Sequence, residues 1–462
     1  MVLVLAIGLA LSLDTELSNA ADLRPALNLA REFLETEDES RRQAIAAKLA
    51  AYDDDFREVI RLLQEKKYEP VEPGYVPDEH FTAPDLSADR SDDLLFFLIP
   101  KSYRPERATG LVIFMHGGGA HTGRRAPRHT IDFPDDDDED SSALGDVFDE
   151  AGLIAVGPSA PWDEESYYRW CLEEADDFLA DVIVECRHRF HIDPDRVVLL
   201  GHSMGGFGAF HHVQRQPDRF AAVIANAGSW RLGYWPVIRG TRFCFINGLM
   251  DAEKGERWHY TDIEYARWTT KLLSEQGLDH TFVQHDHGHN LCHGKPLIAR
   301  FLRTTQDVRR DPCFEHVVLA SPVGYSRYYS SKVRHNRWLT LDEASEGRIE
   351  YDELLSDEDV DFDDWELEHR TSRRRGATIE ARNLGNNTIE ISTQNVARFT
   401  VWLHPRMIDV RQPVRIVVND KVQFEGHVKP SLAVALESYE RRRDWGLIYP
   451  IRVPLRLLTD GD

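Results

Sequence analysis

Hydrophobic and polar positions divide the chain into three parts with different periodicities. Between residues 21 and 64, apolar side chains recur every three or four positions, which predicts two or three amphipathic helices. From about residue 79 to Asp311, short runs that are apolar throughout alternate with helical stretches. Strands buried on both faces have this composition. This middle part is therefore predicted to be α/β, a mainly parallel sheet with helices on both sides.

The strands expected in this sheet are residues 94–99, 111–115, 153–156, 197–200, 221–225, 243–246 and 281–283. The main helices expected between them are residues 177–190, 206–214, 263–275 and 296–302.

After Asp311 the pattern changes to short alternating stretches separated by turn residues, over 377–381, 388–392, 397–403, 414–418 and 448–453. Gly385-Asn386-Asn387 and Asn419-Asp420 are expected as hairpin turns, because glycine and asparagine tolerate positive φ. The C-terminal part is therefore predicted to be a small β-rich, sandwich-like unit.

Five segments follow from these patterns. They are a possible signal peptide over 1–20, an N-terminal helical segment over 21–78, a catalytic α/β part over 79–311, a linker over 312–375 with a solvated acidic stretch at 352–364, and a β-rich accessory domain over 376–462.

The N-terminal run Val2 to Leu13 has the length of a signal-peptide core and is followed by Ser18-Asn19-Ala20, a small-x-small cleavage site. It is too short to span a bilayer. No Lys or Arg precedes it, so a helix docked on the main domain is the alternative. A secreted or periplasmic protein is expected, with a cytoplasmic one as the other possibility.

The amino-acid composition excludes several classes of protein. The 462 residues are 42% hydrophobic and 29% charged, as in globular proteins rather than disordered ones. The 55 basic and 79 acidic residues give a net charge of −24, which opposes binding to nucleic acid. The five cysteines lack a C-x-x-C spacing, so neither a disulfide framework nor a structural zinc site is expected.

The sequence Gly201-His202-Ser203-Met204-Gly205 directly follows a predicted strand and precedes a predicted helix. In this context G-x-S-x-G forms a sharp turn that presents the serine hydroxyl above the strand ends. Small residues two positions before and after the serine let the strand and helix approach each other. Ser203 is therefore the expected nucleophile, and an ordinary strand–helix turn is the alternative.

His116-Gly117-Gly118-Gly119 stands at the end of another buried strand. Attack on a carbonyl creates an oxyanion, which backbone amides can stabilise by about 3–4 kcal/mol each. The amides of Met204, Gly117 and Gly118 are the expected donors. The alternative is a glycine-rich loop that binds phosphate or nothing.

A serine nucleophile needs a histidine base and a carboxylate, in the chain order Ser, acid, His. Asp251 and His289 each follow a predicted strand in this order. We expect them to complete the triad, and a carboxylate in a surface turn is the alternative for Asp251. His287 is the reserve base, and Asp262 and Glu264 are weaker candidates for the acid because they open a helix.

Two other groups of residues resemble metal sites. His285, His287 and His289 alternate along a strand end, and residues 135–140 read Asp-Asp-Asp-Asp-Glu-Asp. No second set of ligands follows the histidines, and consecutive carboxylates seldom converge on one point. We expect no metal; His285 and His287 are expected to bond loop backbone, and the acidic run to be an exposed loop.

With these motifs in this order, residues 92–302 resemble the α/β-hydrolase superfamily, and within it carboxylesterases related to polyhydroxybutyrate depolymerases, feruloyl esterases and the catalytic domain of prolyl oligopeptidases. The resemblance implies an acyl-enzyme on serine with no metal and no organic cofactor. Asn247-Gly248 departs from the His-Gly that often precedes the acid in relatives. About 90 residues precede the sheet, too few for the propeller of a prolyl oligopeptidase.

The expected function is hydrolysis of carboxylic esters, on carbohydrate-linked or polyester substrates. A serine peptidase acting on short peptides and an inactive binding protein are the alternatives. A polysaccharide or a protein is the possible partner of the C-terminal part. Aromatic residues after the strands are expected either to line the substrate pocket or to support the next helix. The candidates for the pocket are Trp162, Tyr167, Trp170 and His202, and Trp230, Tyr234 and Trp235 carry the same ambiguity.

Overall fold

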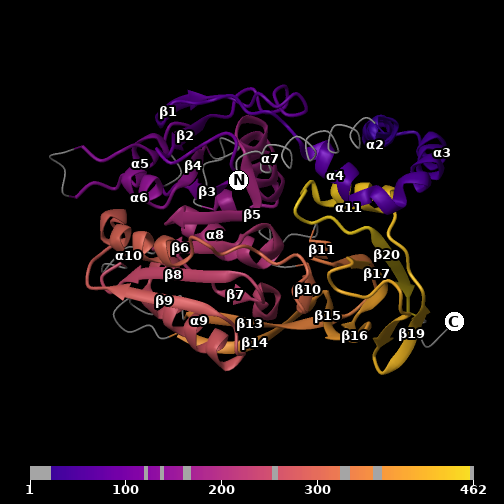
Figure 1. The fold of residues 1–462 in the computed structure, drawn as a ribbon. Helices are drawn as coiled ribbons and strands as arrows, with labels where there is room; N and C mark the ends of the chain where they lie inside the picture. The colour runs from indigo at the N-terminus through magenta and orange to yellow at the C-terminus, as the bar shows by residue number, and fades with distance from the viewer. Residues whose placement is uncertain are drawn as a thin grey trace, which may run out of the picture.

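The computed structural model describes residues 22–118, 123–135, 140–159, 168–251, 259–322, 333–356 and 367–457. Its largest element is an eight-stranded sheet with the order β1-β2-β4-β3-β5-β6-β8-β9 (Figure 1). The pairs β1/β2 and β2/β4 are antiparallel, and the six strands from β4 to β9 run parallel. The strands are β1 (Gly74–Glu79), β2 (Leu95–Ile99), β3 (Thr109–Met115), β4 (Leu153–Pro158), β5 (Ile192–His202), β6 (Ala222–Asn226), β8 (Arg242–Gly248) and β9 (His280–His285).

Alternate residues of this sheet point into two separate cores, as the period of a strand requires. On β3, Leu111 and Ile113 join the core formed with one set of helices, whereas Val112 and Phe114 join the other. The first set is α7 (Glu174–Arg189), α8 (Met204–Arg215) and α9 (Ile263–Glu275), and the second is α5 (Arg128–Ile131), α6 (Gly145–Glu150) and α10 (Leu291–Thr304). The predicted α/β architecture is therefore confirmed.

The C-terminal region contains two further sheets. One has the order β10-β15-β16-β18-β19 and the other β11-β12-β17-β20. Side chains from both, including Ile379, Leu341 and Phe399, lie in one continuous apolar core. The predicted turns at Asn386-Asn387 and Asn419-Asp420 have positive φ and connect antiparallel neighbours. The strands are β10 (His316–Ser321), β11 (His335–Asn336), β12 (Leu339–Ala344), β15 (Ala377–Gly385), β16 (Thr388–Gln394), β17 (Val396–Leu403), β18 (Val414–Val418), β19 (Lys421–Gly426) and β20 (Ile451–Arg456).

Residues 312–375, expected as a linker, instead contain strands β10 to β14. β13 (Arg348–Ser356) and β14 (Leu367–Arg375) form an antiparallel hairpin that pairs through β13 with β7 (Leu232–Gly233). The expectation was wrong because charged residues hide the strand pattern. Glu353, whose side chain is 2% exposed, is neutralised by Arg370 and Arg374 of the neighbouring strand. The rest of the acidic stretch, 357–364, lies outside the described residues.

The N-terminal helices pack against a helix close to the other end of the chain. These are α2 (Arg24–Glu35), α3 (Glu39–Leu49) and α4 (Phe56–Gln64), and their partner is α11 (Leu432–Arg442) (Figure 1). Phe33 and Leu49 share one apolar cluster with Leu432 and Leu436. The short 3₁₀ helices are η1 (Ala50–Asp55), η2 (Arg169–Cys171), η3 (Pro217–Arg219), η4 (Trp235–Ile238) and η5 (His259–Thr261).

A buried arginine connects the α/β part to the segment after α11. Both Asp444 oxygens accept from Arg310 at 2.6 Å, and Asp195 on β5 accepts from the same guanidinium at 2.9 Å. The Arg310 side chain is 1% exposed. Burial alone would raise the pKa of Asp444, but the positive charge of Arg310 lowers it to about 2. The ionised pair is therefore retained inside the protein.

Several sequence predictions fall outside the described residues. The possible signal peptide over 1–20 is one, and most of the acidic run at 135–140 is another. Among the residues that are described, no helix combines the length and apolarity needed to cross a bilayer.

We predict that Asp444→Asn lowers the free energy of unfolding at pH 7 by about 3 kcal/mol, because removing one partner leaves a buried guanidinium short of charge compensation. Chemical denaturation measures this. Asp444 has a lowered pKa in the folded state, so its contribution is present above about pH 4 and is lost as the pH falls towards 2. The deficit of the variant is expected to shrink over that range.

Asp409→Asn is the matched control, since Asp409 forms an ion pair with Arg411 on the surface, where the arginine side chain is 85% exposed. Such pairs contribute little. Equal stability of the two variants would contradict the role given to Asp444.

Candidate active site

Ser203 lies at the turn between β5 and α8 with φ 55° and ψ −116°. A positive φ in a residue with a β-carbon costs about 1–3 kcal/mol and persists only where the surroundings enforce it. Two backbone hydrogen bonds hold it here. The Ser203 N–H donates to the Asn226 carbonyl at 2.9 Å, and the Ser203 carbonyl accepts from the Phe207 N–H at 3.0 Å.

The glycines on either side of Ser203 are required by contact. A β-carbon at Gly201 would lie 2.0 Å from the Gly205 carbonyl oxygen, and one at Gly205 would lie 2.0 Å from the Met115 carbonyl oxygen. β3, β5 and α8 therefore approach each other at a distance that no side chain permits. This close packing explains the G-x-S-x-G spacing.

The structure brings Ser203, His289 and Asp251 together. His289 Nε2 lies 2.8 Å from Ser203 Oγ, although the two residues are 86 positions apart. The other ring nitrogen, Nδ1, contacts the Asp251 carboxylate. The Asp251 side chain is fully buried, whereas that of His289 is 41% exposed. A carboxylate, an imidazole and a hydroxyl in this order can transfer a proton from the hydroxyl.

The loops that carry Asp251 and His289 are joined by their backbones. Leu249 N–H donates to the His285 carbonyl at 2.8 Å, and Met250 N–H donates to the His287 carbonyl at 3.2 Å. A β-carbon at Gly248 would lie 2.1 Å from the His287 carbonyl oxygen, so the two loops meet only because residue 248 is glycine. This contact keeps the carboxylate beside the imidazole.

Two of the three predicted oxyanion donors, Met204 and Gly117, lie beside Ser203. Met204 begins α8, where the first amides of a helix have no intrahelical acceptor. A β-carbon at Gly117 would lie 3.1 Å from Ser203 Cβ, so the Gly117 backbone passes next to Ser203. Gly118 has φ 115°, a conformation that favours glycine. Gly119 lies outside the described residues.

Trp170, predicted as a pocket residue, is fully buried and supports the same strand end. Its Nε1 donates to the His116 carbonyl at 3.1 Å, and its ring packs edge-on against the His116 ring. Trp170 therefore has the alternative role that the sequence allowed, which is to support the structure. Trp230 and Trp235 are also buried, and Tyr234 is half-buried. Trp162 and Tyr167 lie outside the described residues.

His202, the fourth predicted pocket residue, is half-buried, and its ring centroid lies 5.2 Å from that of His289. Burial, and to a lesser extent the neighbouring His289, lowers the pKa of His202 to about 3. His202 is therefore neutral at physiological pH and adds no positive charge beside the His289 ring.

Two residues near the triad were missed by the sequence analysis. Asn290 caps α10 by accepting from the Cys292 N–H at 3.1 Å, and its Oδ1 also accepts from Ser142 Oγ at 2.9 Å. It thereby fixes the loop that carries His289. An asparagine directly before a helical pattern is an N-cap signal that could have identified it. Asn226, whose carbonyl holds Ser203, had no comparable signal.

The other acid and base candidates have different partners. Asp262 caps α9 by accepting from the Glu264 N–H at 2.7 Å, and Glu264 forms an ion pair with Arg267. The His287 ring stacks on His293 with centroids 4.2 Å apart. His285 Nδ1 accepts from the His287 N–H at 3.3 Å. Within the described stretches, no group of three His, Cys, Asp or Glu side chains has the arrangement of a metal site.

Comparison with protein families finds a match over part of the chain. Residues 156–238 match the model of the prolyl oligopeptidase family, a range that contains Ser203 but neither Asp251 nor His289. No curated protein matches the sequence.

Solved structures similar to the chain include several hydrolases. A thermostable esterase has 16% identity and a TM-score of 0.39. The alignment covers 51% of this chain and 64% of the esterase. A ferulic acid esterase has 17% identity and a TM-score of 0.38 over 51% of this chain and 99% of its own. An acylaminoacyl peptidase has 14% identity and a TM-score of 0.36 over 52% of this chain and 42% of its own. At these values the likenesses say nothing about the substrate.

The mainly parallel sheet, the strained serine turn at the end of β5 and the family match over that turn agree with one another. Residues 156–238, which include the Ser203 turn, are therefore similar to the prolyl oligopeptidase family, and they lie within an α/β fold.

Proposed function

We propose that this protein hydrolyses carboxylic esters through a triad of Ser203, His289 and Asp251. The observation that carries the proposal is the 2.8 Å distance between His289 Nε2 and Ser203 Oγ, together with the buried Asp251 carboxylate on the opposite side of the imidazole. The nucleophile and base are within hydrogen-bonding distance, as general-base activation of a serine needs.

In the proposed first step, Ser203 Oγ attacks the ester carbonyl carbon while its proton passes to His289 Nε2. Asp251 holds the imidazole tautomer and stabilises the imidazolium that forms. The amides of Met204, Gly117 and Gly118 donate to the oxyanion of the tetrahedral intermediate. Collapse of the intermediate breaks the ester C–O bond, and His289 returns its proton to the leaving alcohol.

The second half repeats the sequence with water. Water attacks the acyl carbon, its proton passes to His289, and Ser203 leaves as the protonated hydroxyl when the acid is released. No cofactor enters either step. The Ser203 turn at the N-terminus of α8 also favours negative charge, because the N-terminal end of a helix carries a partial positive charge.

The substrates we propose are carbohydrate-linked or polymeric esters. The 41% exposure of His289 supports this choice, because a base that is open to solvent is accessible to an ester group on a large molecule.

A peptidase acting on short peptides is the second candidate, and the match of residues 156–238 to the prolyl oligopeptidase family favours it. The same triad would then cleave an amide, whose amine leaving group must be protonated as it departs. An inactive binding protein is less consistent with a hydroxyl and an imidazole 2.8 Å apart.

Ser203→Ala is expected to reduce kcat on an ester substrate by about 10⁶, the scale seen when a triad nucleophile is lost. It should also abolish labelling by a fluorophosphonate probe. Ser274→Ala is the control, since Ser274 is exposed on α9 and should leave both properties unchanged. A residual rate within about tenfold of the parent would reject Ser203 as the nucleophile.

His202→Gln is expected to leave the acid limb of the kcat/KM profile in place. His202 has a pKa of about 3 and is therefore mostly neutral above pH 4, so we expect the protonation that stops catalysis to occur on another group. Rates measured from pH 4 to 9 with an uncharged ester test this. An acid limb that moves by a pH unit or more in the variant would identify His202 as the titrating group.

Turnover of a matched pair of substrates, an ester and an amide with the same acyl group, is expected to be faster for the ester. The two assays use one enzyme preparation, with Ser203→Ala as the blank. An amide rate that equals or exceeds the ester rate would replace the esterase proposal with the peptidase.

A further inference from the structure

We infer that the outward face of the β12–β17–β20 sheet binds an acidic polysaccharide, a polymer that carries both carboxylates and hydroxyl groups. The site is a groove of about 530 Å³ between the sheet and the end of α11. Four of its lining residues are arginines: Arg398 on β17, Arg441 on α11, and Arg452 and Arg456 on β20.

The arginines are placed together by the register of the strands. Arg398 of β17 stands directly opposite Arg456 of β20. Like charges at opposed positions of an antiparallel pair are unfavourable, so this arrangement costs stability. Glu343 offsets part of that cost by accepting from Arg398 Nε at 2.6 Å, and Arg456 also interacts with a neighbouring group. An unfavourable pair of like charges on an exposed surface indicates a site that binds a ligand, because proteins tend to retain such local costs where they serve a function.

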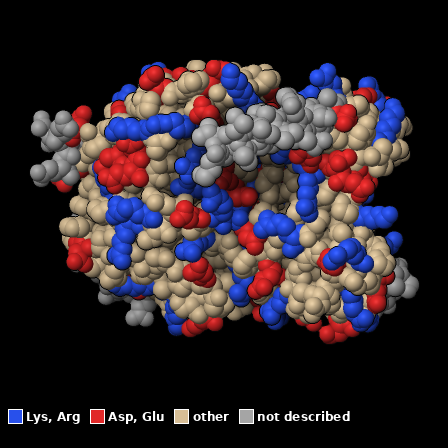
Figure 2. Space-filling model, viewed as in Figure 1, with Lys and Arg blue, Asp and Glu red and all other residues tan. Residues whose placement is uncertain are grey.

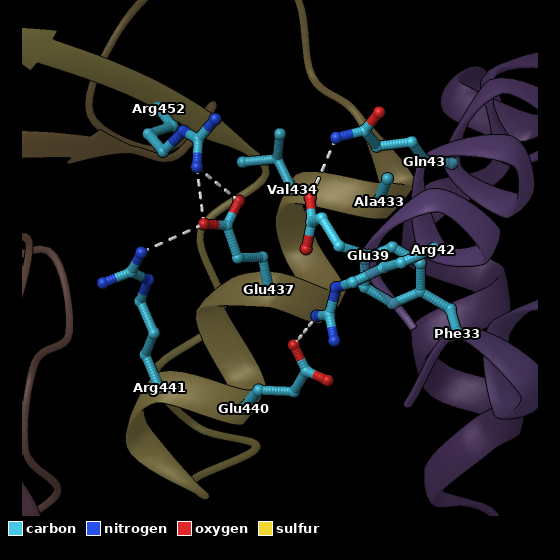
Figure 3. A pocket seen from close by; sticks show the side chains of 11 residues that line it. Phe33, Glu39, Arg42, Gln43, Ala433, Val434, Glu437, Glu440, Arg441 and Arg452 are labelled. Atoms are coloured by element: carbon cyan, nitrogen blue, oxygen red, sulfur yellow. Dashed lines mark hydrogen bonds and ion pairs between the residues drawn. The ribbon is translucent and has the colours of Figure 1, made fainter. Parts of the chain in front are cut away.

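Two further arginines are held in place by one glutamate. Glu437 accepts from Arg452 Nη1 at 2.7 Å and from Arg441 Nη2 at 3.3 Å. The Arg441 guanidinium also lies 5.7 Å from the centre of the buried Trp402 ring. Figure 3 shows both arginines directed at Glu437.

This arrangement leaves donors for a ligand. Arg398, Arg441 and Arg452 each use one nitrogen in these bonds, while a guanidinium carries five N–H groups in a fixed fork that matches a carboxylate. Their side chains are 56%, 46% and 40% exposed. The arginines are therefore oriented by the protein and still accessible to solvent.

The groove continues in two directions, which favours a polymer over a small anion. Arg441 and Arg452 also line a second groove of about 510 Å³ that runs between α11 and the helices α2 and α3 (Figure 3). Arg452 and Pro454 line a third, of about 300 Å³, beside Phe424. Figure 2 shows basic side chains projecting at the edge of the molecule where Figure 1 places β20.

Carboxylates among the arginines point to a sugar polymer rather than an acidic peptide. Asp342 lines the first groove and accepts from Thr400 Oγ1 at 2.7 Å, and Glu39 and Glu440 line the second. Such groups accept hydrogen bonds from hydroxyls but repel a ligand that consists of closely spaced carboxylates. A chain of uronate sugars presents both a carboxylate and hydroxyls in every unit.

The full-length protein is titrated calorimetrically with polygalacturonate, with poly-glutamate and with neutral dextran at low ionic strength. We expect polygalacturonate to bind, dextran to give no heat of binding, and poly-glutamate to bind at least tenfold more weakly. Raising the salt to about 0.5 M should weaken the polygalacturonate complex, because exposed charges are screened.

The double variant Arg398→Gln/Arg456→Gln and the single variant Arg452→Gln should each bind polygalacturonate at least tenfold more weakly than the parent. Arg373→Gln is the matched control. Arg373 lies on β14, is 72% exposed and forms an ion pair with Glu350, so it resembles Arg398 but lies outside the groove. If the double variant does not fold, Arg398→Lys/Arg456→Lys keeps the charge, and loss of the guanidinium fork should still weaken binding.

The inference is overturned if the parent does not bind polygalacturonate, if dextran or poly-glutamate binds as tightly, or if the groove variants bind as well as Arg373→Gln does. Fluorophosphonate labelling of Ser203 is followed in every variant and should be unchanged. Loss of binding with intact labelling separates this site from the proposed esterase reaction, which stands or falls on Ser203.

Discussion

The conformation of Ser203 is the constraint on which the arrangement of the site depends. Its positive φ is unfavourable by itself and is maintained by the contact of β3, β5 and α8, where residues 201 and 205 have no space for a β-carbon. The rigid centre of the parallel sheet enforces this turn. Because the turn is rigid, the hydroxyl has a fixed position to which the loop with His289 must be fitted.

The parallel sheet brings the loop with His289 close to Ser203, because the carboxyl ends of its strands lie along one edge. β3 ends beside Gly117, β5 at Ser203, β8 before Asp251 and β9 before His289. Residues that are 38 and 86 positions apart in sequence therefore need only short loops to meet. Hydrogen bonds between the last two loops, together with the cap that Asn290 gives to α10, then hold the carboxylate against the imidazole. The proposed chemistry depends on these backbone contacts as well as on the three side chains.

The positions of Ser203, Asp251 and His289 could be predicted because each follows a buried strand and because glycines at fixed spacing report a local backbone shape. The roles of residues that depend on partners distant in sequence could not be predicted. Trp170 reads equally well as a ligand-binding ring or as core, and its burial against His116 decides the matter. The strands between residues 316 and 375 were missed for a related reason. Glu353 and Arg374 appear solvated in sequence, but they neutralise each other across a hairpin that only the tertiary structure creates.

The apolar cluster between the N-terminal helices and α11 has a consequence for synthesis. Phe33 and Leu49 emerge from the ribosome about four hundred residues before Leu432 and Leu436, the side chains that cover them. Until then these side chains can pack only against the other N-terminal helices, and the part of their surface that contacts α11 stays exposed. These helices are thus made long before they are fully packed, and premature termination before residue 432 would leave a truncated product with an exposed apolar surface.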